Sequence, residues 1–125
     1  EGGSSRQSLG RLGEELAAAL LQRHGYELVD RNWRHRTGEI DIVARKRDCH
    51  VFVEVRTRTG DAFGTPEESI TPRKRDRMVA CALEYVSKHP ELQDAPWRID
   101  VVAVELDEQG RQTRAELIES AVPLD

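Results

Sequence analysis

The sequence is poor in the residue types that mark several common functional classes. Aromatic residues make up 5% of the 125 residues, and the two cysteines, Cys49 and Cys81, form no CxxC pair. The four histidines share no ligand spacing, which argues against a zinc site of thiolates or imidazoles. No Ser or Cys stands in a recognisable nucleophile motif, and no glycine-rich phosphate-binding loop is present. These absences argue against zinc-thiolate, covalent-nucleophile and P-loop chemistry.

Long apolar runs are also lacking. No stretch approaches the roughly 18 apolar residues that a membrane-spanning helix needs, and no secretory signal is visible. Charged residues make up 34% of the chain. We therefore expect a soluble protein of a reducing cytoplasm, with no membrane partner. At this length a single domain with a modest aliphatic core is expected over residues 8–122, and residues 1–7 are expected to be a flexible leader or an expression remnant.

Apolar periodicity predicts a small α/β (α+β) domain, with a mixed central sheet of four to five strands flanked by helices. Leucines at helical spacing predict a first helix that ends at His24-Gly25, and Gly13 beside this stripe permits close packing. Strands are expected over 27–33, in a hairpin over 38–58 and over 97–106, and residues 115–118 are a candidate edge strand. Thr71-Pro72 predicts the start of a second helix, because Thr caps a helix and Pro suits its first position. The predicted order is α-β-β-β-α-β-(β).

The predicted hairpin, GEIDIVARKRDCHVFVEVRTR, gathers charge on one face. If Arg47-Asp48 forms a two-residue turn, Asp41 lies opposite Glu54 and Glu39 lies opposite Arg56, while the other face is apolar and belongs to the core. Opposed carboxylates with Cβ atoms roughly 5 Å apart destabilise a sheet unless positive charge lies between them. A divalent cation bound by oxygen ligands would supply that charge. The alternative is a solvated face with a Glu39–Arg56 ion pair.

The formal net charge of −4 conceals a basic middle segment. Residues 31–77 carry twelve Lys or Arg and eight Asp or Glu, whereas the segments on either side are acidic. A local basic patch of this kind is typical of nucleic-acid binding, although a solvated helix start and hairpin tip would have the same composition. A metal bound between the carboxylates would invert the charge of the pocket and favour phosphate.

Several short motifs, taken in order, resemble a known family. They are Gly13-Glu14, Arg31-Asn32-Trp33-Arg34, Gly38-Glu39-Ile40-Asp41, Val53-Glu54-Val55-Arg56-Thr57-Arg58, Phe63-Gly64, Lys74 and Arg98-Ile99-Asp100-Val101-Val102. An acidic residue followed by E-x-K on the adjoining strand is typical of the restriction-endonuclease-like, or PD-(D/E)xK, nucleases. The whole set, over residues 9–120, resembles the bacterial YraN-like family within them. That family is uncharacterised in biological role, and its fold is similar to that of archaeal Holliday-junction resolvases, which cut four-way DNA junctions as dimers.

The resemblance implies roles for individual residues. Asp41 and Glu54 would bind Mg²⁺ or Mn²⁺, with Glu14 as a third acid from the first helix, and Arg56 occupies the position of the catalytic Lys. Lys can lose its proton when its pKa is depressed, whereas Arg stays protonated. Arg56 is therefore compatible with a slow enzyme, an altered mechanism or a binding protein that has lost catalysis. The residues expected to contact DNA are Arg34, Arg36, Arg58, Arg73, Lys74 and Arg77.

Three side chains have two interpretations each. Lys74 on the buried face of the second helix would either replace the missing catalytic Lys, or extend its charged end to solvent or to a backbone phosphate. Asp100 is expected to pair with an Arg rather than bind metal, and Trp33 either stacks on a base of an opened junction or belongs to the core. The sequence thus predicts a metal-dependent endonuclease-like protein that acts on DNA, and it favours branched or junction DNA as the substrate. A homodimer is a further expectation. The alternatives are a nucleic-acid-binding module that cannot cut and a scaffold domain that has inherited the fold.

Overall fold

Five strands form one mixed sheet in which neighbours in space are also neighbours in the chain. The computed structural model describes residues 6–60 and 64–122. Its elements are α1 (Arg6–Arg23), β1 (Glu27–His35), β2 (Gly38–Lys46), β3 (Cys49–Thr59), the 3₁₀ turn η1 (Glu67–Ser69), α2 (Pro72–Ser87), the 3₁₀ turn η2 (Pro90–Leu92), β4 (Trp97–Leu106) and β5 (Gln112–Ile118). The order is β1-β2-β3-β4-β5, with β3 and β4 parallel and the other pairs antiparallel. The predicted mixed sheet and element order are confirmed, and the candidate edge strand is β5.

Two expectations concern residues outside the described ranges. Residues 1–5 of the predicted leader lie outside them, as does Phe63 of the Phe63-Gly64 motif.

Within the described chain, neither helix combines the length and the apolar character that crossing a bilayer would require.

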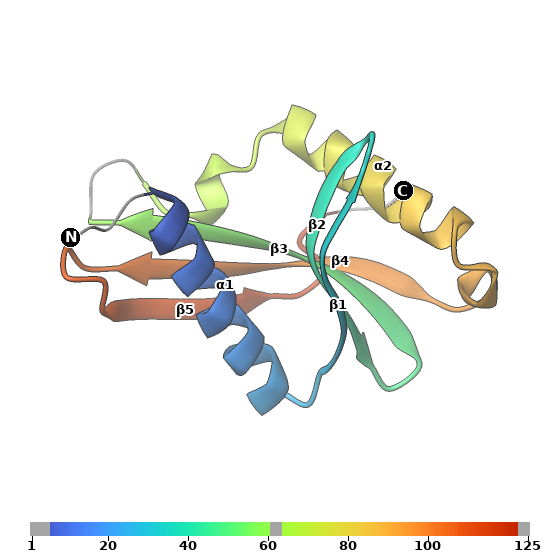
Figure 1. The fold of residues 1–125 in the computed structure, drawn as a ribbon, viewed down its shortest axis with the longest axis horizontal. Helices are drawn as coiled ribbons and strands as arrows, with labels where there is room; N and C mark the ends of the chain where they lie inside the picture. The colour runs from blue at the N-terminus through green and yellow to red at the C-terminus, as the bar shows by residue number, and fades with distance from the viewer. Residues whose placement is uncertain (1–5, 61–63, 123–125) are drawn as a thin grey trace.

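Each face of the sheet is covered by one helix (Figure 1). Against α1, buried residues of the helix such as Leu21 pack on Ile42, Val53 and Val102 of the sheet. Against α2, the buried cluster comprises Ile40, Val43, Phe52, Cys81, Ala82, Tyr85, Leu92, Ile99 and Val122. The prediction of one apolar and one charged face for the hairpin is therefore wrong near its turn, because α2 buries Val43 and Phe52 on the second face. On this second face, the carboxylates Glu39, Asp41 and Glu54 lie toward the end of the hairpin away from the turn.

Both helix boundaries follow from local chemistry. Thr71 Oγ1 accepts a hydrogen bond from the Lys74 backbone N–H at 3.2 Å, and Pro72 is the first helical residue, as predicted. The first helix ends at Arg23, before Gly25 at a φ of 86°. A Cβ atom at Gly13 would overlap the Thr57 hydroxyl, which explains why α1 carries glycine where it crosses β3.

The predicted hairpin register is confirmed, but the ladder is shorter than expected. Val43 pairs with Phe52 and Ile42 with Val53, and Arg47 in the turn has a φ of 58°. The ladder between β2 and β3 ends at Ile42 and Val53, whereas β2 stays paired with β1 as far as Gly38. The Asp41–Glu54 and Glu39–Arg56 pairs therefore do not form as ladder partners, because β2 leaves β3 before it reaches them.

A buried ionic cluster holds β4 to the start of β1 and to the C-terminal segment. Asp100 has a fully buried side chain and accepts hydrogen bonds from Arg98 Nε at 3.0 Å, Tyr26 OH at 3.0 Å and Ser120 N at 2.9 Å. Burial, followed by the charge of Asp100, raises the pKa of Tyr26 to about 12. The expectation that Asp100 pairs with an Arg is confirmed by this geometry.

Candidate metal and phosphate site

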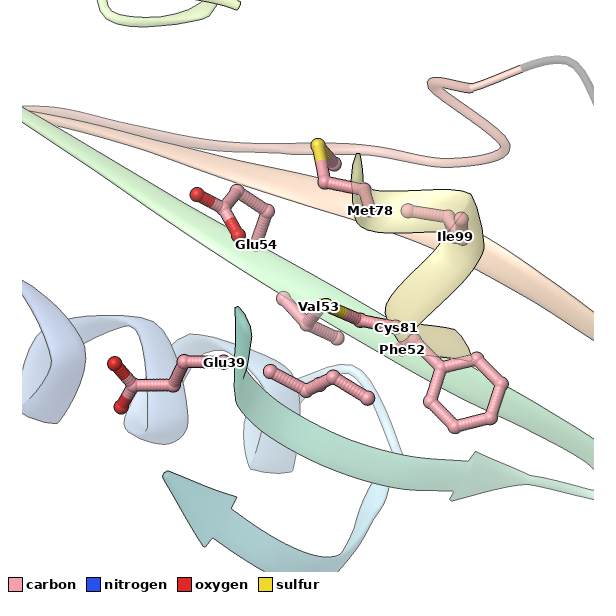
Figure 2. A pocket seen from close by; sticks show the side chains of 8 residues that line it. Glu39, Phe52, Val53, Glu54, Met78, Cys81 and Ile99 are labelled. Carbon is pink, nitrogen blue, oxygen red and sulfur yellow. The ribbon is translucent and has the colours of Figure 1, made fainter. Parts of the chain in front are cut away.

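A cavity of about 180 Å³ lies where β2 has separated from β3, beside the N-terminal half of α2. Its lining comes from three elements and comprises Gly38, Glu39, Glu54, Arg56, Lys74, Arg77, Met78 and Cys81. A narrower space of about 10 Å³ continues inward from four of the same residues, which is room for about one water molecule. Figure 2 shows this inner part, where the carboxylates of Glu39 and Glu54 extend to one side and Phe52, Met78, Cys81 and Ile99 lie on the other. The pocket thus combines a charged mouth with an apolar floor.

Asp41 occupies the gap that the departing strand leaves. Its Oδ2 accepts the Val55 backbone N–H at 2.8 Å, so that a carboxylate takes the place of the next ladder carbonyl. Burial, followed by the charge of Glu54, raises the pKa of Asp41 to about 8, although the bond from Val55 acts in the opposite direction. Without a further cation, the ionised form of this carboxyl is strongly disfavoured.

Two other acids share this environment. Burial raises the pKa of Glu54, and the Arg56 guanidinium opposes that effect. Burial, then the charge of Glu39, raises the pKa of Glu14. The three predicted ligands are neighbours in one partly desolvated region, because the charges of Glu54 and Glu14 both act on Asp41, and burial is the largest cause of the raised pKa of each acid.

These acids do not form a closed ligand set. Among residues 6–60 and 64–122, no group of three or more His, Cys, Asp or Glu side chains is arranged to hold a metal ion. Asp41 is engaged by Val55, and Glu54 Oε2 accepts from Arg56 Nη1 at 3.3 Å. The donors are nevertheless carboxylate oxygens, which are the ligands that Mg²⁺ and Mn²⁺ prefer. The residues fit such an ion in type, and its binding would require their side chains to rearrange.

Asn32 joins two of the acids and was not singled out by the sequence. In the amide orientation that suits both neighbours, its nitrogen donates to Glu14 Oε1 at 3.2 Å and to Glu39 Oε2 at 2.9 Å. Its backbone has a φ of 54° inside β1, a conformation that Asn tolerates better than most residues. Two signals were available: an Asn within a strand, where this residue is depleted, and its place in the Arg31-Asn32-Trp33-Arg34 motif.

Arg56 and Lys74 bring positive charge to the same pocket from different elements. Arg56 on β3 bridges Glu54 and Ser69, and its Nε lies 2.9 Å from Ser69 Oγ. Lys74 on α2 donates from Nζ to the Ser69 carbonyl at 3.4 Å, and its charge lowers the pKa of Glu54 against the effect of burial. Lys74 thus reaches the pocket, as the helical spacing allowed. Ser69 was not predicted, because the segment before α2 has no periodic pattern.

The other predicted DNA contacts are spread more widely. Arg77 lines the pocket, and Arg34 Nε lies 3.6 Å from Glu39 Oε2, with most of its side chain exposed. Three further arginines are exposed and belong to other parts of the chain: Arg36 in the turn between β1 and β2, Arg58 near the end of β3 and Arg73 in the first turn of α2. The structure therefore divides the six predicted contacts into pocket residues, a rim residue and outlying residues.

Trp33 belongs to the core rather than to an open surface. Its ring stacks on His35 at 5.6 Å between centroids and meets the edge of Tyr85 at 5.2 Å. It packs against the buried cluster under α2. Of the two interpretations of this residue, the packing supports the structural one.

The chain is similar over most of its length to proteins of one family. The model of the uncharacterised protein family UPF0102 matches residues 13–104. A UPF0102 protein of Roseiflexus castenholzii is 47% identical over 117 residues, which is 94% of each chain. A UPF0102 protein of Anaeromyxobacter dehalogenans is 51% identical over 102 residues, which cover 82% of this chain and 75% of the relative. A UPF0102 protein of Moorella thermoacetica is 46% identical over 117 residues, which cover 94% of this chain and 97% of the relative. The matched segment includes every residue of the pocket.

Proposed function

Since this chain belongs to the uncharacterised protein family UPF0102, the YraN family that its motifs indicated, we propose a function from its own site, namely metal-dependent hydrolysis of phosphodiester bonds in DNA. The observation that carries the proposal is the pocket in which Glu54, Arg56 and Lys74 meet beside Asp41. Branched or junction DNA is the proposed substrate, on the strength of the resemblance to junction resolvases. The homodimer implied by the same resemblance stays a prediction, which sedimentation velocity tests.

Asp41 and Glu54, with Glu14 from α1, would hold Mg²⁺ or Mn²⁺. An ion bound there would polarise the scissile phosphate and lower the pKa of a water molecule. The burial of Asp41 beside Glu54 supports this assignment, because a divalent ion would offset the desolvation and the repulsion that together raise the pKa of Asp41. The Val55 N–H would hold Asp41 in place during this process.

Arg56 would act through its charge rather than through proton transfer. A guanidinium keeps its proton, so Arg56 would steady the charge that develops on the phosphate instead of activating water. Lys74 and Arg77 would contact neighbouring phosphate oxygens from α2. The apolar floor formed by Met78 and Cys81 would limit access of bulk water and so strengthen these interactions.

A nucleic-acid-binding module without catalysis is the second candidate. Two observations favour it: Arg replaces the usual Lys at position 56, and the described acids form no closed ligand set. Such a module would bind DNA in a salt-sensitive manner whether or not metal is present.

Cleavage of a labelled DNA panel tests the proposal. Linear duplex, single strand, flap and four-way junction would each be incubated with Mg²⁺ or Mn²⁺ and the wild-type protein, Glu54→Ala or Arg56→Lys. Glu119→Ala, at an exposed residue after β5, is the control. We expect metal-dependent cutting by wild type that is lost in Glu54→Ala and kept in the control.

Two results would change the assignment. Cutting by Arg56→Lys but not by wild type would indicate a site disarmed at this position. Absence of cleavage by both wild type and Arg56→Lys, together with DNA binding that persists in EDTA, would contradict the nuclease proposal and favour the binding module. Calorimetry with Mn²⁺ supplies an independent check, because Asp41→Asn should lose affinity while keeping the fold.

A further inference from the structure

One serine in the segment between β3 and α2 is bonded to two basic side chains of the pocket. Arg56 Nε donates to Ser69 Oγ at 2.9 Å, and Lys74 Nζ donates to the Ser69 carbonyl oxygen at 3.4 Å. Both cations also interact with Glu54. Ser69 is therefore a shared anchor for two charges that arrive from different elements of the fold.

The orientation of the Ser69 hydroxyl is fixed within its own turn. Its single proton is donated to the Pro66 carbonyl at 2.5 Å, so that the oxygen presents lone pairs to Arg56. A guanidinium has donors and no acceptor, which makes this hydroxyl a matched partner. The bond to Pro66 thus orients Ser69 to accept from Arg56.

The turn that carries Ser69 is anchored to the far edge of the sheet. Arg114 on β5 donates to both carboxylate oxygens of Glu67, from Nη1 at 3.1 Å and from Nη2 at 2.8 Å. Arg114 is itself held by Glu105 at 2.7 Å and by Glu116. Because these partners lie on β4 and β5, the position of η1 does not depend on the pocket that Ser69 serves.

The contact with Ser69 also limits how Arg56 pairs with Glu54. Arg56 reaches Glu54 with Nη1 alone, at 3.3 Å on Oε2, while Nε is bonded to Ser69. Without that acceptor, the guanidinium could turn and take both oxygens of Glu54 in the two-bond geometry that arginine favours with carboxylates. Such a pair would compete with any other ligand of Glu54.

We propose that Ser69 is a positioning residue that holds Arg56 and Lys74 as a pair of cations for a phosphate group and keeps Arg56 from closing on Glu54. The phosphate as ligand rests on the proposed function, whereas the holding of Arg56 does not. Ser69→Ala should therefore let Arg56 pair with both oxygens of Glu54 through its two Nη atoms, leave Nε without an acceptor and weaken the binding of Mn²⁺ at Glu54.

The test uses the Arg56 side-chain Nε–Hε signal in ¹⁵N NMR spectra, assigned by its absence in Arg56→Lys. In Ser69→Ala we expect hydrogen exchange of this Hε to rise by about tenfold, because its acceptor is lost. Ser69→Thr keeps a hydroxyl and should restore the wild-type signal. The matched control is Ser87→Ala, which removes a hydroxyl bond of the same three-residue span, from Ser87 Oγ to Glu84 O at 2.8 Å, at the end of α2.

An unchanged Arg56 signal in Ser69→Ala would overturn the proposal, as would an equal change in Ser87→Ala. If Ser69→Ala unfolds, Glu67→Gln replaces it, since weakening the Arg114 anchor should release the same signal to a smaller extent. The two hypotheses fail separately. Faster exchange of the Arg56 Hε in Ser69→Ala, in a protein that neither binds nor cuts DNA, would support the positioning role and contradict the nuclease proposal. DNA cleavage by wild type, with an Arg56 Hε exchange rate that Ser69→Ala leaves unchanged, would support the nuclease proposal and contradict the positioning role.

Discussion

The charge of Asp41 should impose a measurable cost on folding that an amide would remove. Asp41→Asn keeps the shape of the side chain and an oxygen that can accept the Val55 N–H, so the local geometry is preserved. What changes is the ability to ionise in a buried place beside Glu54. The variant therefore isolates the electrostatic cost of the predicted metal ligand.

The magnitude follows from the shift in pKa. Burial and Glu54 raise the pKa of Asp41 from its usual 3.8 to about 8. Between these values the folded protein holds a proton that the unfolded chain has released, so stability falls as pH rises through this window. Each pH unit in the window corresponds to about 1.4 kcal/mol, which gives roughly 3–4 kcal/mol between pH 5 and pH 8. In Asp41→Asn this contribution is absent.

Urea unfolding at pH 5, 6.5 and 8, without divalent ions, measures the effect. We expect Asp41→Asn to gain stability relative to wild type as pH rises, whereas Asp48→Asn in the exposed hairpin turn removes the same formal charge and should not. Stability curves of wild type and Asp41→Asn that run parallel with pH would refute the reasoning. Adding Mn²⁺ at pH 8 should stabilise wild type and narrow the difference, because an ion that binds only the folded state favours it.

Three further changes test other parts of the structure. Gly13→Ala should destabilise the fold by about 1–3 kcal/mol in urea titrations, because the new methyl group overlaps the Thr57 hydroxyl. Adding Thr57→Ala should restore most of the loss, and a Gly13→Ala variant as stable as wild type would contradict the close packing of α1. Asp100→Ala should cost about 3–5 kcal/mol by the same assay, since it leaves Arg98 without its buried partner, and a loss below 1 kcal/mol would count against the buried cluster. Arg77→Gln should lower the salt dependence of DNA binding by about one unit of slope in fluorescence anisotropy, and an unaltered slope would place the backbone contact elsewhere.

The elements could be predicted because their signals are local. Alternation with a period of two gave the hairpin register, and Thr71-Pro72 gave the start of α2, since capping chemistry acts over a few residues. The departure of β2 from β3 could not be predicted in this way. It depends on which neighbouring strand keeps its ladder, and a strand pattern does not contain that information. The predicted pairing of Glu39 with Arg56 failed for this reason.

The candidate site likewise contains residues that the sequence predicted and residues that it did not. Glu54 and Arg56 are two residues apart on one strand, so any correct strand assignment brings them to one face. Lys74 joined them because the helical period placed it on the inner face of α2. Ser69 and Asn32 were missed for different reasons. Ser69 acts from an irregular segment, and the role of Asn32 depends on a positive φ, which residue spacing does not reveal.

The contacts of Arg56 change what a Lys at this position would mean. A guanidinium spans two partners with separate nitrogens, here Glu54 and Ser69, whereas an ammonium offers a single point of attachment. Arg56→Lys would therefore hold Ser69 and Glu54 together only where both lie within reach of one nitrogen, and it would supply a group that can lose its proton. Faster cleavage by this variant would consequently have two explanations, a better proton acceptor or a released Glu54. Arg56→Gln separates them, because it releases Glu54 from the guanidinium without supplying a group that can take up a proton.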